Sequence, residues 1–436
     1  MTLTGKRILL LFTTTGYQAG SFREAAEKLG VGIVAGSDRC HNLSDPWRDG
    51  AIPLRFQHPE ASAEKIIAAA QSSPFDAILA IGDKPTLTAA LASEALGLRG
   101  NPPQSVRICH DKYLFRERLR AAGATAPAYH RLSITTHHPR LPGGIGYPCV
   151  LKPLCLSASR GVIRADSDAQ FAEAFRRIAL LLEAPDIRIL KDQAADWILV
   201  ESFLPGPEVA LEGIVDQGIL TVLALFDKPD PLDGPYFEET IYVTPSRLPE
   251  AVQAEIVKTT EQAVHAVGLS HGPIHAELRL TPDGPRVLEV AARPIGGLCS
   301  RALRFDGGMS LEELIIHHAL GHHALGHHAL GRHAPGEPIA AIRREPCASG
   351  VMMVPVPAAG VLEEVKGLEA ASSTPNVEEI RITAKLKQTL IPWPEGSSYL
   401  GFIFARGSSP ETVETALRQA HRKLEFVITP ALPVLR

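Results

Sequence analysis

Short apolar runs alternate with amphipathic segments through the first part of the chain. The runs predict strands and the segments predict helices, in the order 7–13 (strand), 21–29 (helix), 31–36 (strand), 62–71 (helix), 76–81 (strand) and 85–96 (helix). Such alternation is typical of a parallel sheet covered by helices. It predicts a small parallel α/β domain over residues 1–105, which ends near Pro102 and Pro103.

The pattern changes after His110, and residues 106–196 predict a small α+β domain. Its expected elements are a charged helix at 111–121, strands at 148–152 and 161–165, and a helix at 168–183. The expected strands of the third segment, residues 197–336, are 198–203, 208–215, 219–226, 237–243, 273–280 and 286–291, with a helix at 248–267. Many strands joined by short turns predict a sheet that forms one wall of a cleft.

The last segment, residues 337–436, is expected to form a separate α+β cap. It mixes short strands at 351–356, 379–383 and 400–405 with a terminal helix at 410–424. The whole chain is therefore predicted to be a multidomain protein of the α/β and α+β classes.

Composition narrows the function. The chain has 436 residues, 45% of them apolar, so it is able to bury several cores. Its 44 basic and 48 acidic residues give a formal net charge of -4. This charge favours an enzyme that acts on small molecules over a protein that binds nucleic acid or a membrane. Its 6 cysteines form no C-x-x-C pair, and no apolar stretch reaches the ~20 residues that span a bilayer, so a cytoplasmic location is expected.

One segment is low in complexity. The sequence His-His-Ala-Leu-Gly at 317–321 recurs at 322–326 and 327–331, and it decays at 332–336. Paired histidines are able to bind transition metals. A duplicated linker that extends the end of a helix is the favoured interpretation, because no carboxylate or cysteine accompanies the repeat in the sequence.

Three further features suit phosphoryl transfer, which needs cations along a triphosphate, a loop of N–H donors and carboxylates for a metal ion. Lys112 opens the second segment, and Lys152 ends an apolar strand, from which its side chain is expected to project into a cleft. The loop at 156–161 then allows close backbone approach to phosphate oxygens. Its small residues include Ser157, Ser159 and Gly161. Taken alone, this loop is equally typical of an ordinary hairpin.

A second candidate lies where an apolar strand breaks at Pro205-Gly206-Pro207. The Glu208 carboxylate is suited to accept hydrogen bonds from both hydroxyls of a ribose, and the backbone before the break is suited to present an amide edge to adenine. That backbone comprises Glu201, Ser202, Phe203 and Leu204. A solvated hairpin with two surface acids is the alternative.

The strongest pair is Glu277 and Glu289, which lie in two apolar runs joined by a Pro-Asp-Gly turn. In a hairpin the two acids fall on one face of neighbouring strands, where an unpaired charge is costly. Oxygen ligands beside phosphate indicate magnesium or manganese. Arg293 then supplies a guanidinium for a transferred phosphate, and Gly296 and Gly297 supply bare N–H groups for a carboxylate. A structural ion pair between Glu289 and Arg293 is the alternative.

Taken in order, these residues resemble the ATP-grasp superfamily over roughly residues 1–330. The resemblance implies an ATP-grasp fold with an N-terminal α/β domain. It also implies that Lys112 and Lys152 bind ATP phosphates, that the 201–204 segment binds adenine and Glu208 binds ribose. Glu277 and Glu289 would hold magnesium, and Arg293 would steady an acyl phosphate.

Within that superfamily, two departures matter. Many members carry asparagine two residues after the second metal glutamate, where this chain has Ala291. The pattern from Glu289 to Arg293, together with His275, is instead similar to bacterial L-amino acid ligases, whose extra C-terminal domain the last hundred residues also resemble. The second departure is in the loop, which has Ala158 and Arg160 where glycine or serine is common.

The resemblance implies an ATP- and magnesium-dependent ligase that joins the carboxylate of one amino acid to an amine. Arg293, Lys152 and Glu289 are the expected catalytic residues, and His275, Arg293, Gly296, Gly297 and Glu238 the expected substrate residues. A different ATP-grasp ligase or carboxylase, acting on a specialised-metabolite acid or on bicarbonate, is the first alternative. A non-catalytic protein that binds metal or nucleotide through the histidine repeat is the second. A homodimer is left open.

Overall fold

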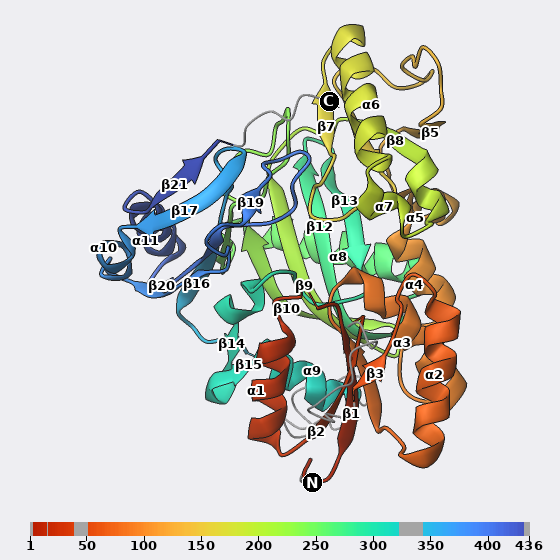
Figure 1. Cartoon of the computed structure of the whole chain (residues 1–436), viewed down its shortest axis with the longest axis vertical. Coiled ribbons are helices and arrows are strands. Elements are labelled where there is room, and N and C mark those ends of the chain that lie inside the picture. Colours follow the sequence, from red (N-terminus) through yellow and green to blue (C-terminus); the bar gives the residue numbers. More distant parts are fainter. Residues whose placement is uncertain (1–2, 15, 39–50, 322–342, 431–436) are drawn as a thin grey trace.

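The computed structural model describes residues 3–14, 16–38, 51–321 and 343–430. Within these residues the strands form an eight-stranded sheet, two four-stranded sheets, a three-stranded sheet and a two-stranded sheet. The eight-stranded sheet, called the large sheet below, lies between the N-terminal unit and the second four-stranded sheet, called the small sheet. The C-terminal strands of the large sheet extend to the left in Figure 1. This mixture of α/β and α+β units confirms the expected fold class.

The N-terminal unit is a parallel sheet, as the sequence predicts. Its strands lie in the order β3-β2-β1-β4: β1 (Arg7–Phe12), β2 (Gly32–Ser37), β3 (Ile52–Pro53) and β4 (Ala77–Ala80). The accompanying helices are α1 (Ala19–Leu29), α2 (Pro59–Ser72) and α3 (Asp83–Leu96). A helix that the sequence pattern did not predict, α4 (Pro103–His110), begins at Pro103, whose fixed φ suits a first helical turn.

The small sheet has the order β5-β8-β6-β7 and is antiparallel throughout. Its elements are α5 (Lys112–Ala121), β5 (Tyr129–Ser133), β6 (Cys149–Pro153), β7 (Ile163–Ala165), α6 (Asp168–Leu182), α7 (Pro185–Arg188), a 3-10 turn (Gln193–Asp196) and β8 (Trp197–Ser202). Grouping 198–203 with the strands that follow it is wrong, because β8 lies between β5 and β6 with Ile198, Leu199 and Val200 buried. Pro205 and Pro207, which lack the N–H that a ladder needs, then end this pairing.

The large sheet has the order β13-β12-β9-β10-β11-β16-β20-β18. Its first five strands are β9 (Glu208–Asp216), β10 (Ile219–Asp227), β11 (Ile241–Thr244), β12 (His271–Thr281) and β13 (Gly284–Ala291), with helix α8 (Glu250–Val267) packed beside them. The expected strand at 237–243 forms only from Ile241, because the preceding residues leave the ladder and Glu239 turns toward Lys228.

After β13 the chain forms small elements that pack on the large sheet. They are two 3-10 turns (Cys299–Ala302 and Asp306–Gly308), β14 (Arg304–Phe305), β15 (Met309–Ser310) and α9 (Leu311–Ala319). Helix α9 begins with a capping box between Ser310 and Glu313. It contains the first two histidines of the repeat, His317 and His318, whereas the copies from residue 322 onward lie outside the described residues.

The C-terminal segment is an α+β unit, as expected, but it is not separate from the central sheet. Its strands β16 (Ala348–Val354), β18 (Val377–Ile382) and β20 (Gly401–Gly407) continue the large sheet through the β11–β16 ladder. Every residue of β16 is buried, in agreement with its mostly apolar sequence. The other elements are β17 (Gly360–Lys366), α10 (Leu368–Ser372), β19 (Thr389–Leu390), α11 (Pro410–His421) and β21 (Glu425–Thr429).

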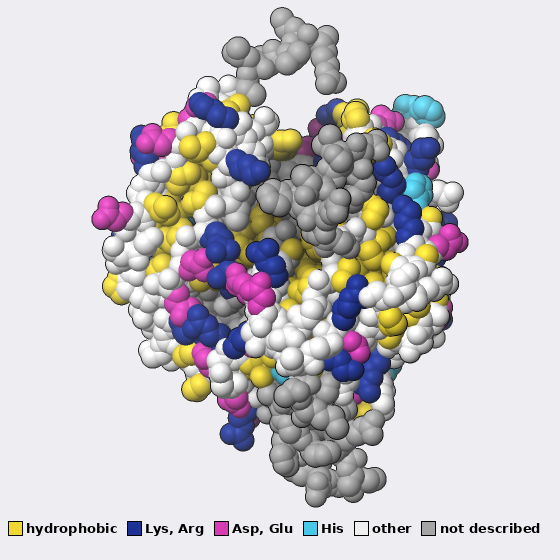
Figure 2. Space-filling model, turned by 60° about the horizontal axis from the view of Figure 1, so that its bottom comes forward, with side chains coloured by type: hydrophobic (Ala, Val, Ile, Leu, Met, Phe, Trp, Pro, Cys, Tyr) yellow, Lys and Arg dark blue, Asp and Glu magenta, His cyan; other side chains and the backbone are white. Residues whose placement is uncertain are grey.

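The surface is mixed in character. Basic and acidic side chains are interspersed on the face that Figure 2 shows, with apolar side chains between them. This agrees with the formal net charge of -4 and with the absence of a dominant sign in the sequence. Among the described helices, none has the length and apolar character needed to cross a lipid bilayer.

Gly206 lies in the connection between the small and large sheets, at a position where a larger residue should be unfavourable. This residue has φ +107°, and a Cβ at its position would lie 2.1 Å from the carbonyl oxygen of Leu280. Gly218 also has positive φ (+82°), but a Cβ there would meet nothing within 4 Å. We expect Gly218→Ala to cost about 1–2 kcal/mol through backbone strain. Gly206→Ala should cost about 1–3 kcal/mol more, because backbone atoms must also move.

The two variants are compared by urea unfolding of the full chain, followed by far-UV circular dichroism. Equal losses of unfolding free energy in both would contradict the close approach of Gly206 to Leu280.

Candidate active site

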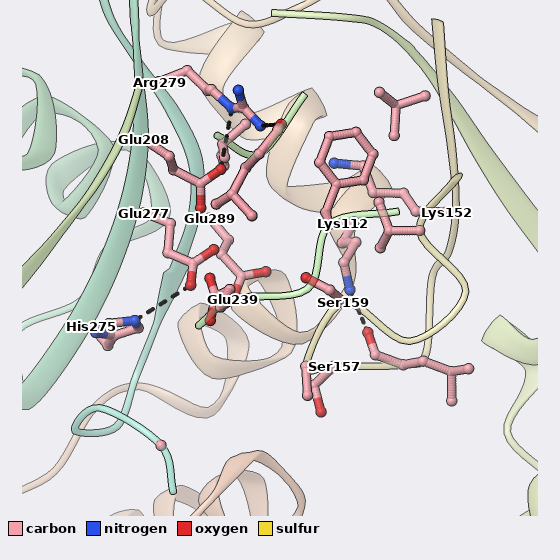
Figure 3. Close-up of a pocket in the computed structure, with 18 of the residues that line it drawn as sticks. Lys112, Lys152, Ser157, Ser159, Glu208, Glu239, His275, Glu277, Arg279 and Glu289 are labelled. Atoms are coloured by element: carbon pink, nitrogen blue, oxygen red, sulfur yellow. Dashed lines mark hydrogen bonds and ion pairs between the residues drawn. The ribbon is translucent and has the colours of Figure 1, made fainter. Parts of the chain in front are cut away.

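A cavity of about 330 Å³ lies where the N-terminal unit, the small sheet and the large sheet meet. Figure 3 shows carboxylates on one side of it and Lys112 and Lys152 on the other. Most of the residues expected from the sequence line this cavity, namely Lys112, Lys152, Ser157, Ser159, Glu201, Ser202, Phe203, Leu204, Glu208, His275, Glu277, Glu289, Arg293, Gly296 and Gly297. Gly161 and Glu238 are not among its lining residues.

Lys152 is held by a buried ionic cluster. The Glu201 carboxylate on β8 pairs with Lys152 on β6 and accepts a 2.6 Å hydrogen bond from Nε of Arg116 on α5. Burial alone would raise the pKa of Glu201, but Arg116 and Lys152 outweigh it and lower that pKa to about 2. The Glu201 side chain therefore faces the two cations and orients Lys152, while the chain that follows it forms the cavity wall.

Lys112 stands at the start of α5 and reaches the loop at 156–161. Its Nζ donates a 2.6 Å hydrogen bond to the carbonyl of Leu156. Within the loop, Ala158 and Ser159 both have positive φ, at 55° and 53°, a conformation that few residues other than glycine adopt. Such a backbone needs support from its surroundings.

That support comes from the C-terminal segment. Nε1 of Trp393 donates a 3.0 Å hydrogen bond to the Ala158 carbonyl, and the Gly161 amide donates a 2.8 Å bond to the Pro394 carbonyl. Arg160 also donates to the carbonyl of Glu395, at 2.8 Å. Gly161 is thus a structural position: it has φ +76°, and a Cβ there would lie 2.8 Å from Pro153.

Glu208, at the start of β9, is buried and doubly paired. Its carboxylate accepts a 2.6 Å hydrogen bond from Nζ of Lys228 and lies 3.2 Å from Nε of Arg279. Arg279 in turn stacks over the ring of Phe203, with 5.6 Å between the guanidinium carbon and the ring centroid. The alternative of two surface acids is therefore wrong, since Glu201 and Glu208 are both buried.

Glu277 and Glu289 lie directly opposite each other in the antiparallel β12–β13 ladder, and both line the cavity. Glu239 and Glu208 lie beside them, with the ligand oxygens of Glu208, Glu239 and Glu277 within 4.8 Å of one another. Burial and the charge of Glu239 raise the pKa of Glu277. Oxygen donors that crowd together in this way fit a hard divalent cation such as Mg²⁺.

Lys228 and Glu239 are functional candidates that the sequence reasoning missed. Lys228 is buried, and its Nζ pairs with Glu208 and Glu239 and lies 3.3 Å from Glu277. The same signal that identified Lys152 was present, because Lys228 directly follows the apolar strand β10. Glu239 was passed over for its neighbour Glu238, which the sequence reasoning selected from the same segment as a substrate residue.

His275 links the carboxylates to the turn at 293–297. Its Nδ1 lies 3.1 Å from Glu212 and its Nε2 lies 3.5 Å from Glu277. Burial would lower the pKa of His275, but these two carboxylates raise it to about 9, so the imidazole is charged at neutral pH. Glu212, a buried residue that the sequence did not single out, also accepts a 3.0 Å hydrogen bond from the Ile295 amide.

Arg293 connects the site to the N-terminal unit. Its Nε and Nη2 donate to the carboxylate of Asp83, the first residue of α3, at 2.7 and 3.2 Å. Burial would raise the pKa of Asp83, but Arg293 outweighs it and lowers that pKa to about 2. Arg293 therefore makes its ion pair with Asp83, and the alternative pair with Glu289 is wrong.

The loop at 236–240 presents a different acid from the one expected. Glu239 lines the cavity and Glu238 does not. Neighbouring side chains of an extended segment point to opposite sides, so only one of the two acids can face the carboxylate cluster. Burial raises the pKa of Glu238 to about 7, and one of its carboxyl oxygens has no hydrogen-bond partner.

Three family models match separate parts of the chain. Residues 23–100 match the ATP-grasp N-terminal domain, residues 145–302 match the ATP-grasp domain, and residues 352–429 match the L-amino acid ligase C-terminal domain 2. The last match agrees with the resemblance noted for the final hundred residues.

Known proteins give the same result. The chain is 27% identical over 318 residues to the alanine–anticapsin ligase of Bacillus subtilis (strain 168), a match that covers 66% of this chain and 64% of that relative. A crystal structure of an L-amino acid ligase from Bacillus licheniformis has a TM-score of 0.76 and 26% identity, and the match covers 98% of this chain and 99% of that one. The fold is also that of an ATP complex of carboxyaminoimidazole ribonucleotide synthase from Aspergillus clavatus (TM-score 0.66, 17% identity, 97% and 99% covered).

The buried cluster around Glu201 generates a prediction about stability. Glu201→Gln leaves two buried cations without a counter-ion and should cost about 3–5 kcal/mol. Arg116→Met should cost less, because Lys152 still balances Glu201. Glu173→Gln, which breaks an exposed pair with Arg176, should leave the unfolding free energy nearly unchanged, because solvent screens that pair. Urea unfolding of each variant measures these losses.

The deficit of Glu201→Gln should also depend on pH. Because the folded pKa lies below the ordinary 4.5, the stabilisation by Glu201 is present above pH 4.5 and is lost as pH falls toward about 2. A deficit that stays constant from pH 7 down to the lowest pH at which the protein is folded would contradict this assignment.

Proposed function

Since this chain belongs to the ATP-grasp superfamily, we propose that it is an ATP-dependent ligase that activates a carboxylate as an acyl phosphate and joins it to an amine. The observation that carries the proposal is the pairing of Glu277 with Glu289 across one ladder, in the cavity that Lys112 and Lys152 also line. The match spans 64% of the length of the alanine–anticapsin ligase, so the activity of that relative is not assigned to this chain.

In this proposal the lysines bind the triphosphate. Lys112, at the start of α5, and Lys152, on β6 of the small sheet, approach it from the same side of the cavity. Glu201 and Arg116 fix the direction of Lys152, so little side-chain entropy is lost when phosphate binds. The backbone amides around Ser157 and Ser159 supply further donors, in a loop whose unusual φ values the C-terminal segment maintains.

The nucleoside lies against the connection between β8 and β9. Ser202, Phe203 and Leu204 supply the edge for adenine, and Glu208 accepts hydrogen bonds from the ribose. Arg279 and Lys228 hold the Glu208 carboxylate in place through their ion pairs. Ser202, Phe203, Leu204, Glu208 and Arg279 all line the cavity, and Lys228 supports Glu208 from outside that lining.

Glu277 and Glu289 hold Mg²⁺ or Mn²⁺. Their fit rests on oxygen-only donors and on the raised pKa of Glu277, since a carboxylate crowded by other carboxylates gains from a cation. When bound, such a metal ion neutralises charge on the phosphate oxygens. Lys228 and Arg279 both pair with Glu208, and their positive charges balance part of the negative charge of the carboxylates.

The reaction consists of two displacements. An oxygen of the substrate carboxylate bonds to the γ-phosphorus as the bond to the β–γ bridging oxygen breaks, and ADP departs. The amine nitrogen of the second substrate then bonds to the acyl carbon, the bond to the phosphate oxygen breaks, and the nitrogen loses a proton. The contribution of the protein is mostly position and charge neutralisation.

Arg293 and the turn after it serve the reacting carboxylate. The guanidinium neutralises the negative charge that develops on the acyl phosphate, and Asp83 holds it from behind. The amides of Gly296 and Gly297 orient the carboxylate, and the charged His275 adds a positive field beside Glu277. The C-terminal match to L-amino acid ligases supports amino acids as both the acid and the amine.

A product screen tests this function. The protein is incubated with ATP, Mg²⁺ and a matrix of paired amino acids, and phosphate release is measured together with the masses of the products. Coupled release of phosphate and a dipeptide is expected, and added hydroxylamine should trap the activated acid as a hydroxamate. Glu289→Gln should lower turnover at least about 100-fold. The control Glu255→Gln, on the exposed face of α8, should leave turnover unchanged.

Phosphate release only with bicarbonate or a non-amino acid would replace the amino-acid assignment by the first alternative. A total lack of ATP turnover with every acid would refute the ligase assignment.

Arg293 offers a second test. Arg293→Ala should reduce kcat about 10²–10³-fold while ATP still binds, because the residue acts on charge that develops during the reaction. Arg293→Lys should recover only part of the rate, because lysine keeps the positive charge but cannot form the bidentate hydrogen bonds of a guanidinium. Asp83→Asn should have a smaller effect, since the guanidinium remains. Full activity of Arg293→Ala would contradict its role.

A further inference from the structure

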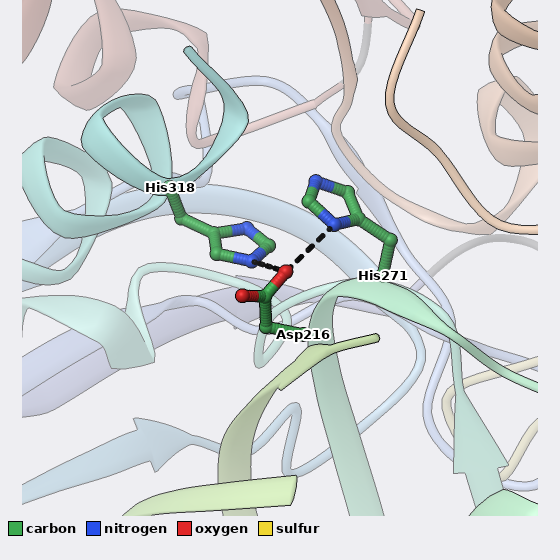
Figure 4. Close-up of side chains that lie close together, drawn as sticks. All are labelled: Asp216, His271 and His318. Carbon is green, nitrogen blue, oxygen red and sulfur yellow. Dashed lines mark ion pairs between the residues drawn. The ribbon is translucent and has the colours of Figure 1, made fainter. Parts of the chain in front are cut away.

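A second cluster of potential ligands lies away from the cavity, at the opposite end of the strand that begins with Glu208. Asp216 is the last residue of β9, and His271 is the first residue of β12 and its direct partner in the ladder. His318, from the last turn of α9, completes the group. Figure 4 shows both imidazoles directed at the same oxygen of Asp216.

The distances do not suit hydrogen bonds. Nδ1 of His271 lies 3.5 Å from Oδ1 of Asp216, and Nε2 of His318 lies 3.7 Å from the same oxygen. Hydrogen bonds between nitrogen and oxygen are about 2.7–3.2 Å long. Two ligands that share one tetrahedral zinc ion, each about 2.0–2.2 Å from it, lie about 3.4 Å apart. All three ligand atoms of the cluster lie within 4.8 Å of one another.

The buried side chain of His318 has a ring nitrogen that lacks a hydrogen-bond partner. It is only 2% exposed, and its Nε2, the atom aimed at Asp216, makes no hydrogen bond. A buried polar atom without a partner is destabilising by about 1–3 kcal/mol. The two imidazole rings also stack, with centroids 4.1 Å apart and an angle of 24° between their planes, and each ring has a nitrogen near Oδ1 of Asp216.

We propose that Asp216, His271 and His318 bind one zinc ion, a site distinct from the proposed ligase centre. Two imidazoles and a carboxylate are ligands that zinc accepts, and water supplies a fourth ligand. The adjoining cavity of about 70 Å³, which His271 and His318 line, has room for a water molecule and not for an organic substrate. The site is therefore structural.

The surroundings explain what such an ion does. It ties the end of α9 to two strands of the large sheet, at the face where the N-terminal unit packs. Asn101 accepts hydrogen bonds from the amides of Ser270 and His271, both at 2.9 Å, and so already anchors that unit beside the cluster. Arg99 lines the same cavity and its positive charge opposes the ion, which sets a limit on affinity.

This site changes the interpretation of the histidine repeat. The favoured linker interpretation rested on the lack of an accompanying carboxylate in the sequence. His318 belongs to the first copy of the repeat, and Asp216 supplies that carboxylate across the fold. The first copy thus has a role in metal binding that is independent of the later copies.

Zinc binding to the full chain, prepared without a histidine tag and stripped with a chelator, tests the proposal. Binding is measured by elemental analysis and by competition with a chromogenic chelator, in the presence of excess Mg²⁺ to occupy the ligase centre. We expect one tight zinc per chain. His318→Gln and the isosteric Asp216→Asn should each weaken it at least about tenfold.

The matched control replaces His322, His323, His327, His328 and His333 by glutamine and keeps the cluster intact. It should retain the tight zinc, and zinc should raise its Tm as it does for the unaltered chain but not for Asp216→Asn. Unchanged affinity in Asp216→Asn, or loss of the tight site in the control, would overturn the proposal. Because Asp216→Asn preserves side-chain shape, its Tm without zinc shows whether it is folded.

Discussion

The structure depends on keeping several carboxylates together away from bulk water. Glu208, Glu239, Glu277 and Glu289 meet at one cavity, where their mutual repulsion is only weakly screened. Lys228, Arg279 and His275 offset this repulsion, and each comes from the large sheet or its edge. The order of the strands β10, β9, β12 and β13 therefore matters for charge as well as for packing, since it places each cation beside the acid it balances.

The rest of the molecule is arranged around that centre. The small sheet brings Lys152 through a buried ion pair with Glu201, and the N-terminal unit brings Asp83 to Arg293. Glu212 joins His275 to the turn that follows Arg293, so this turn is connected to the carboxylate cluster through two buried side chains. Contributions from separate units mean that the site exists only when these units are packed together.

Local patterns in the sequence were sufficient for much of this. The spacing of Glu277 and Glu289 around a short turn fixes their pairing, and the end of an apolar strand identifies Lys152. Contacts across long sequence separations were beyond such patterns, as with Arg293 and Asp83, or Asp216 and His318. The sequence pointed to Glu238, whereas the acid that lines the cavity is its neighbour Glu239. Which of two adjacent side chains faces the cavity cannot be predicted where the strand pairing ends. The sequence also did not show which sheet β8 joins, because both the small and the large sheet contain buried apolar strands.

The hydrogen bonds that join Trp393, Pro394 and Glu395 to the loop at 158–161 show that the C-terminal region depends on a contact outside its own sheet. A C-terminal region that shares a continuous sheet with its neighbour and also supports this loop is not an interchangeable module. Chimeras that exchange this region between related chains must carry both its sheet partner and its loop partner with it. Evolution faces the same limit, so a new C-terminal region can be acquired only together with compensating changes in that loop.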